Sequence, residues 1–177
     1  MNIIRHSASM IVTVLVCLSE AYAQSGWFSQ SSSTNNDLFG VFFTDVNTGT
    51  AVGDSGTILR TSNGGTNWTM QTSGTLNLLQ SVCFTDASTG TVVGKNGTIL
   101  RTTNGGVSWT AQTSPFGSTK NLWQASFTDT NTGTGVGDDG IIIRTTNGGA
   151  NWTSQTSGLT ITVLDGVHFI DANNGAE

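Results

Sequence analysis

Short stretches in which apolar and polar residues alternate recur along this chain, and Gly, Asn or Asp bounds each of them. Alternation of this kind, with turn-forming residues between the stretches, predicts β-strands joined by tight turns. No stretch after the first 23 residues has the spacing of an amphipathic helix. The pattern therefore predicts a four-stranded meander in one representative unit, with strands over residues 38–43, 49–52, 57–61 and 68–73.

The same unit returns twice more, and Trp68, Trp109 and Trp152 mark it at intervals of 41 and 43 residues. A strand-rich unit of about 40 to 45 residues is the signature of a β-propeller, in which blades stack around a central channel. The sequence thus predicts an all-β fold of four-stranded blades of about 42 residues each. The predicted full blades span residues 38–73, 79–114 and 122–157.

Parts of two more blades flank these units. Residues 27–32 match the outermost strand of a unit, and residues 164–177 match the beginning of one. Propellers have about four to eight blades, and a first outer strand often completes the last blade so that no sheet edge stays open. We therefore expect an incomplete ring in this sequence, with further blades beyond Glu177.

The first 23 residues have the composition of a signal peptide. Arg5 and His6 precede an apolar run over residues 10–18, and Ala21-Tyr22-Ala23 has the small residues that signal peptidase cleaves after. We expect export to the periplasm, the cell surface or the medium, with residues 24–177 as the propeller segment. No later segment has the roughly 20 apolar residues of a membrane-spanning helix.

Charge narrows the range of partners. The net charge is −5, charged residues make up 10% of the chain, and no cluster of Lys or Arg occurs. Nucleic acids are therefore not expected as partners, because they are bound by concentrated positive charge. Once the signal peptide is removed Cys83 is the sole cysteine, so no disulfide is expected within the chain.

One motif recurs in every full unit: Thr61-Ser62-Asn63-Gly64-Gly65-Thr66-Asn67-Trp68 returns at residues 102–109 and 145–152. It resembles the Asp-box, or BNR repeat, whose form is Ser/Thr-x-Asp/Asn-x-Gly-x-x-aromatic. The longer pattern, with Phe-Thr-Asp before it and Ile-Leu-Arg-Thr leading into it, resembles the repeats of the photosystem II stability/assembly factor family. That resemblance implies a β-propeller. Photosynthetic members of the family bind a photosystem II subunit without catalysis and are thought to use an arginine-rich patch.

The residues of the Asp-box also suit a structural turn. Its Asn can accept backbone N–H groups, its Gly residues permit positive φ, and its Trp can pack over the hairpin. We therefore assign a structural role to the box residues: Thr61, Asn63, Gly65, Trp68, Thr102, Asn104, Gly106, Trp109, Thr145, Asn147, Gly149 and Trp152.

Candidate binding residues come from two sets. The first set is Arg60, Arg101 and Arg144, which recur just before each box. Either each Arg packs between blades and bonds to a neighbouring Asp or carbonyl, or the three form a cationic band that binds carboxylates of a partner. The second set comes from a position at which the sequences of the units differ. This variable slot, at the start of the first strand, holds Phe39, Gln80, Trp123 and Asp165. Of this second set we select Phe39 and Trp123, together with Lys120 from the long connection before Trp123.

These patterns favour an exported, non-catalytic binding platform for another protein, without a cofactor. A cell-surface or carbohydrate-associated propeller is the alternative. A sialidase-like glycosidase is a third possibility; it would need a Tyr nucleophile or paired carboxylates in further blades, because Tyr22 in the signal peptide is the only tyrosine here. Asp129-x-Asn131-x-Gly133 is similar to the start of a calcium loop, but its repetition in other units favours a backbone turn, and no metal site is expected.

Overall fold

The computed structural model describes residues 29–169, 171, 175 and 176. The signal peptide predicted over residues 1–23 lies outside the described residues, as do Trp27 and Phe28 of the predicted outer strand. Residues 29–32 carry no strand assignment, so the outer strand over residues 27–32 stays a prediction. Within the described residues, no helix has the length and apolar character to cross a membrane.

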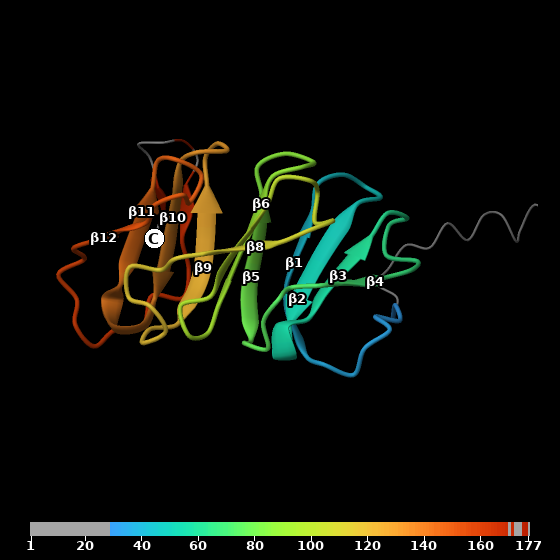
Figure 1. The fold of residues 1–177 in the computed structure, drawn as a ribbon, viewed down its shortest axis with the longest axis horizontal. Helices are drawn as coiled ribbons and strands as arrows, with labels where there is room; N and C mark the ends of the chain where they lie inside the picture. The colour runs from blue at the N-terminus through green and yellow to red at the C-terminus, as the bar shows by residue number, and fades with distance from the viewer. Residues whose placement is uncertain (1–28, 170, 172–174, 177) are drawn as a thin grey trace, which may run out of the picture. The chain divides into compact units, whose positions relative to one another are not determined.

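Three four-stranded antiparallel sheets follow one another along the chain, one for each predicted full unit, and we call them blades (Figure 1). Strands pair in chain order within each blade. The first contains β1 (Leu38–Phe43), β2 (Gly49–Gly53), β3 (Ile58–Thr61) and β4 (Thr69–Gln71). The second contains β5 (Leu79–Phe84), β6 (Gly90–Gly94), β7 (Ile99–Thr102) and β8 (Thr110–Gln112). The third contains β9 (Leu122–Phe127), β10 (Gly133–Gly137), β11 (Ile142–Thr145) and β12 (Thr153–Gln155). The all-β fold of four-stranded blades is confirmed.

A fourth blade begins beside the third. Here β13 (His168–Phe169) pairs with β14 (Gly175–Ala176) and lies against β9. The amide of Val167 donates to Gln124 Oε1 at 3.0 Å, and the amide of Phe169 donates to Ser126 Oγ at 3.1 Å. The described residues thus form three blades and the first strand pair of a fourth, which is an incomplete ring.

The two ends of a blade are built from different connections. Turns between first and second strands lie beside the Asp-boxes, since the amide of Gly64 donates to the Asn47 carbonyl at 2.9 Å. We call this the turn end. Hairpins between second and third strands lie beside the connections that enter each blade, since the amide of Asp54 donates to the Asp37 carbonyl at 2.9 Å. We call this the crossing end.

Hairpins at the crossing end need two consecutive residues of positive φ. In the first blade these are Ser55 at 54° and Gly56 at 69°, within the short turn η1 (Asp54–Gly56); η2 (Asp138–Gly140) is its counterpart in the third blade. Two positive φ values are typical of the type I′ turn, whose twist matches that of the flanking strands. A Cβ on Gly56 would also lie 2.0 Å from the Thr75 carbonyl oxygen, so the close approach of the chain excludes a larger residue there.

At the turn end, each Asp-box closes on itself through its Thr and Asn. Thr61 Oγ1 accepts a hydrogen bond from the Gly65 amide at 2.9 Å and donates one to Asn63 Oδ1 at 3.0 Å. Asn63 Oδ1 also accepts from the Asn67 amide at 2.9 Å. The same three bonds recur in the second and third boxes. The box Trp meets the last Phe of the first strand edge-on, with ring centroids 6.1, 6.1 and 5.8 Å apart in the three blades.

Neighbouring blades share apolar clusters. In the first, Leu79 and Val82 of β5 pack against Val52 and Ile58 of the first blade. The second repeats this arrangement one blade later, and its members include Val93, Ile99, Leu122 and Ala125. The core therefore lies between the blades, and each blade depends on its neighbour for burial.

A polar clasp joins the second blade to the third. Gln112 Oε1 accepts from Trp152 Nε1 at 3.1 Å, and Gln112 Nε2 donates to the Gly148 carbonyl at 2.9 Å. Gln71 occupies the equivalent slot of the first blade, but its Nε2 donates at 3.4 Å to the carbonyl of Thr69 in its own blade.

Replacing Gln112 with Ala should lower the free energy of unfolding by about 2 kcal/mol, because it removes the partners of a buried indole N–H and of a carbonyl in the next blade. The matched variant Gln71→Ala should change it by less than about 0.5 kcal/mol, because the Gln71 side chain bonds only within its own blade. Urea unfolding of both variants measures the difference. Equal losses would contradict the inter-blade role of Gln112.

Acid should destabilise the turns between first and second strands. The amides of Ser88 and Thr89 bond Asp86 Oδ1 at 2.7 and 2.8 Å, and these bonds hold the pKa of that carboxyl below its ordinary value of 3.8. The equivalent bonds lower the pKa of Asp45 and Asp129. A carboxyl whose pKa is lower in the folded state stabilises that state above the ordinary pKa, and loses this effect as pH falls through the lower value. The free energy of unfolding should therefore fall below a pH of about 4.

An Asp86→Asn/Asp129→Asn variant keeps the acceptor oxygens but cannot be protonated in this range. Its free energy of unfolding should depend less steeply on pH below about 4 than that of the natural chain, as urea titrations at a series of pH values would measure. Identical slopes for the two proteins would show that these turns do not contribute to the acid sensitivity.

Candidate functional site

The variable slot identified in the sequence coincides with a β-bulge in each of the three four-stranded blades, whereas Asp165 of the fourth unit precedes β13 and lies outside a strand. Strand pairing skips Phe39 in β1, Gln80 in β5 and Trp123 in β9, because the residues before and after each of them pair with the second strand while the slot residue does not. A bulge inserts one residue into one strand and turns its side chain away from the regular alternation. The slot residues are therefore released from packing between blades.

These bulged side chains line a groove of about 730 Å³ along the first strands of all four units. Gln80 lies between Phe39 and Trp123, and His168 belongs to the lining from the fourth unit. Phe39 is 45% exposed. The groove therefore combines aromatic residues, Phe39 and Trp123 among them, with amide and imidazole groups, which can contact apolar and hydrogen-bonding parts of a ligand.

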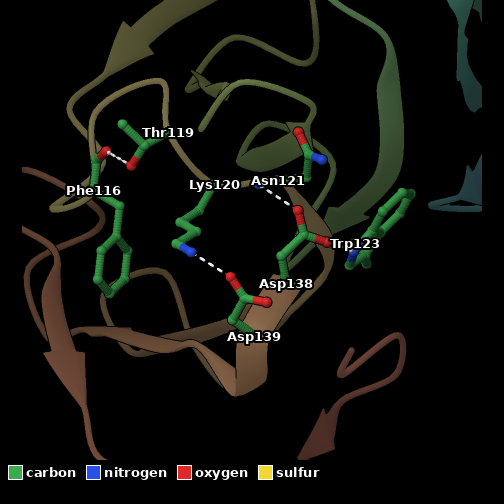
Figure 2. A network of polar contacts seen from close by, with 7 residues as sticks. All are labelled: Phe116, Thr119, Lys120, Asn121, Trp123, Asp138 and Asp139. Atoms are coloured by element: carbon green, nitrogen blue, oxygen red, sulfur yellow. Dashed lines mark hydrogen bonds and ion pairs between the residues drawn. The ribbon is translucent and has the colours of Figure 1, made fainter. Parts of the chain in front are cut away.

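Trp123 is held in place by a side chain that the sequence did not single out. Its indole Nε1 donates to Asp138 Oδ1 at 2.7 Å, and the other carboxylate oxygen, Oδ2, accepts from the Asn121 amide at 3.2 Å (Figure 2). Asp138 begins η2, so the hairpin of the third blade orients the Trp. The signal that could have identified it is local: this hairpin reads Asp138-Asp139, whereas the first blade has Asp54-Ser55 and the second Lys95-Asn96.

Lys120, the third candidate from this region, forms an ion pair with Asp139 across the connection into the third blade (Figure 2). Asp139 has a φ of 53°, so the type I′ hairpin places this carboxylate opposite the connection. Side-chain exposures of 32% for Lys120 and 49% for Asp139 leave the pair accessible at the rim.

The arginines lie toward the turn end, and Arg60 and Arg101 reach into the following blade. Arg60 Nη1 donates to the Gly105 carbonyl of the second Asp-box. Arg101 Nη1 donates to Thr91 Oγ1 at 2.6 Å, and its Nη2 donates to the Thr130 carbonyl of the third blade at 2.5 Å. The Arg101 guanidinium also lies 4.8 Å from the centre of the Phe127 ring. Arg144 Nη1 donates to Thr134 Oγ1 at 3.4 Å.

The six candidate binding residues therefore separate into two groups rather than one site. Phe39, Lys120 and Trp123 lie toward the crossing end, whereas the three arginines lie toward the turn end. Arg60 and Arg101 are each bonded to a carbonyl of the following blade. The geometry supports the inter-blade interpretation of these two side chains over the cationic band.

Chemistry in the groove is limited by its side chains. Burial raises the pKa of the Cys83 thiol to about 12, so this thiol is protonated at neutral pH and packs as a small apolar group. Within the part of the chain that the structure describes, no three His, Cys, Asp or Glu side chains are placed to hold a metal ion together.

A family model described as photosynthesis system II assembly factor YCF48 matches residues 72–162, slightly more than half of the chain. This chain belongs to that family. The predicted resemblance is thereby confirmed. No curated protein sequence matches the chain.

Solved structures of YCF48 have the same fold. One is YCF48 bound to D1 peptide, with 25% identity and a TM-score of 0.66 over 77% of this chain and 45% of that protein. Another is YCF48 from Cyanidioschyzon merolae, with 26% identity and a TM-score of 0.66 over 76% of this chain and 45% of that protein. This chain thus spans a little under half of the length of these YCF48 structures. An ancestral GH74 enzyme, at 21% identity and a TM-score of 0.57 over 66% of this chain and 18% of that enzyme, is similar in fold alone.

The Arg101→Met variant should lower the free energy of unfolding by about 1.5 to 3 kcal/mol, the usual range for hydrogen bonds from a charged group. Met keeps an apolar side chain against Phe127 but cannot donate to Thr91 or Thr130. Lys95→Met removes the same charge from an exposed hairpin and should have little effect. Chemical unfolding of both variants gives the comparison, and equal stability of the two would contradict an inter-blade role for Arg101.

Proposed function

We propose that this chain is part of an exported, non-catalytic propeller that binds a segment of a partner protein in the groove along β1, β5, β9 and β13. The observation that carries this proposal is the coincidence of the bulge with the variable slot. The fold repeats in every unit, whereas the side chains that the bulges direct into the groove differ from unit to unit.

Family membership supports a protein as the partner. YCF48 has been captured with a D1 peptide, and the part of that structure that matches covers most of this chain. For the present chain, we infer a protein segment of the same general kind, bound in extended form along the first strands. Aromatic side chains such as those of Phe39 and Trp123 are enriched at protein interfaces, and Trp is among the residues that contribute most to binding energy there.

Absence of catalysis is part of the proposal, and the roles of the carboxylates support it. Asp45, Asp86 and Asp129 accept backbone amides within their own turns. Asp138 holds the Trp123 indole, and Asp139 pairs with Lys120. A glycosidase would need two carboxylates facing a sugar across a cleft, and these five are committed to turns and to positioning. Export is inferred from residues 1–23, whose pattern is that of a signal peptide.

The test is selection of a random peptide library on the full chain, followed by affinity measurements with variants. Selected peptides should lose about tenfold or more in affinity on Trp123→Ala, because buried aromatic anchors dominate such contacts. Thr103→Val, an exposed change in an Asp-box, should leave affinity unchanged. Circular dichroism and melting of the Trp123→Ala protein control for folding, and Trp123→Phe serves as a milder variant if Ala unfolds it.

Failure to enrich any peptide would overturn the proposal. So would peptides that bind the natural chain, Trp123→Ala and Trp123→Phe equally well, because such binding would lie outside the groove.

A further inference from the structure

Exposed apolar side chains gather on the connections at the crossing end. Leu76, on the connection into the second blade, is 86% exposed, and Ile161, on the connection into the fourth, is 89% exposed. Leu159 and Val163 flank Ile161 and are 46% and 52% exposed. With Phe39 at 45%, these side chains give the crossing end an apolar character that solvent alone does not favour.

Negative charge gathers at the same end of the blades. Asp37 directly precedes β1, Asp165 lies on the connection that leads to β13, and Asp54 and Asp138 begin the hairpins. Because Lys120 is paired with Asp139, Lys95 alone opposes these four carboxylates among the described residues of the crossing end. A surface of one sign attracts a partner segment of the opposite sign and disfavours one of the same sign.

The arginine side chains that could have given the crossing end a preference for an acidic segment lie at the other end of the blades. Arg60 and Arg101 point toward the turn end, where they bond to Gly105 and Thr130 of the following blades. Arg101 is 8% exposed, so it offers little surface to a ligand. These two cations of the third strands therefore serve the scaffold, and the groove mouth keeps its acidic character.

We infer that the occupant of the groove is a basic amphipathic protein segment, with Lys or Arg facing the carboxylates of the crossing end and apolar side chains on Phe39, Trp123 and the apolar connections of that end. This inference rests on the proposed function, because it specifies the chemistry of the ligand in the same groove. An acidic segment is disfavoured at the same place.

Three short synthetic peptides test it on the full chain by fluorescence anisotropy: one alternating Leu and Lys, one alternating Leu and Glu, and one alternating Ser and Lys. The Leu/Lys peptide should bind at least about tenfold more tightly than either of the others at about 0.05 M salt, and this preference should shrink at about 0.5 M salt, where charges are screened.

Two variants with the same change in charge locate the binding. Asp138→Asn/Asp165→Asn removes two charges at the crossing end, while the amide introduced in η2 retains an acceptor oxygen for the Trp123 indole. This variant should weaken the Leu/Lys peptide by about threefold to tenfold. Asp86→Asn/Asp129→Asn removes two charges at the turn end and should change affinity by less than about twofold.

The inference is overturned if the Leu/Glu peptide binds as tightly as the Leu/Lys peptide, or if the two double variants weaken binding equally. Library selection separates this failure from that of the proposed function. Selected peptides that depend on Trp123 but lack Lys and Arg would keep the groove as a binding site and reject the basic ligand. No selected peptide at all would reject both.

Discussion

Burial of the first strand of one blade against the preceding blade is the interaction on which the rest of this structure depends. Leu79 and Val82 are 0% and 6% exposed because Val52 and Ile58 cover them, and full burial of such a side chain is worth about 1.5 to 3 kcal/mol. In β1, which has no preceding blade among the described residues, the equivalent Leu38 is 39% exposed. One blade alone cannot bury its own face, so stability is a property of neighbouring pairs.

Packing between blades also explains which positions of the first strands can differ from unit to unit. Regular positions of a first strand alternate between the two neighbouring blades, so a change there disturbs a packed cluster. The bulge removes one residue from this alternation, and its side chain enters the groove instead. Phe39, Gln80 and Trp123 can therefore differ widely in size and polarity while the flanking Leu38, Leu79 and Leu122 stay the same. Residues that pack between blades and residues that line the groove are thus neighbours in one strand, yet only the first are constrained by packing.

Features that each unit encodes locally were predictable from sequence. The strands, the hairpins and the Asp-boxes each depend on residues that are neighbours in the chain, so the 41 and 43 residue repeat was enough to place them. Contacts between blades were not predictable in this way. Gln71 and Gln112 occupy one slot, yet Gln112 bridges to Trp152 and Gly148 of the next blade, whereas Gln71 bonds within its own blade and the Gly105 carbonyl accepts from Arg60 instead. The buried Nε1 of Trp109 consequently has no partner among the described residues. Identical residues thus took different partners at the two interfaces, where the equivalent arginines also bond to different carbonyls of the following blade.

The class of ligand is set by residues that the family repeat does not fix. Recognition depends on the charged side chains that are not already bonded within the scaffold. The repeated motif does not determine which side chains these are. Here the turn end uses Arg60 and Arg101 to join blades, and the crossing end uses Asp138 to orient Trp123. The bonds of Arg60 and Arg101 to the next blade remove positive charge from the accessible surface. The bond of Asp138 to Trp123, by contrast, leaves a carboxylate beside the groove. A propeller of this family can therefore keep its blades and its groove while the sign of the charge at the mouth, and with it the class of segment bound, is set by a few residues in the hairpins and connections.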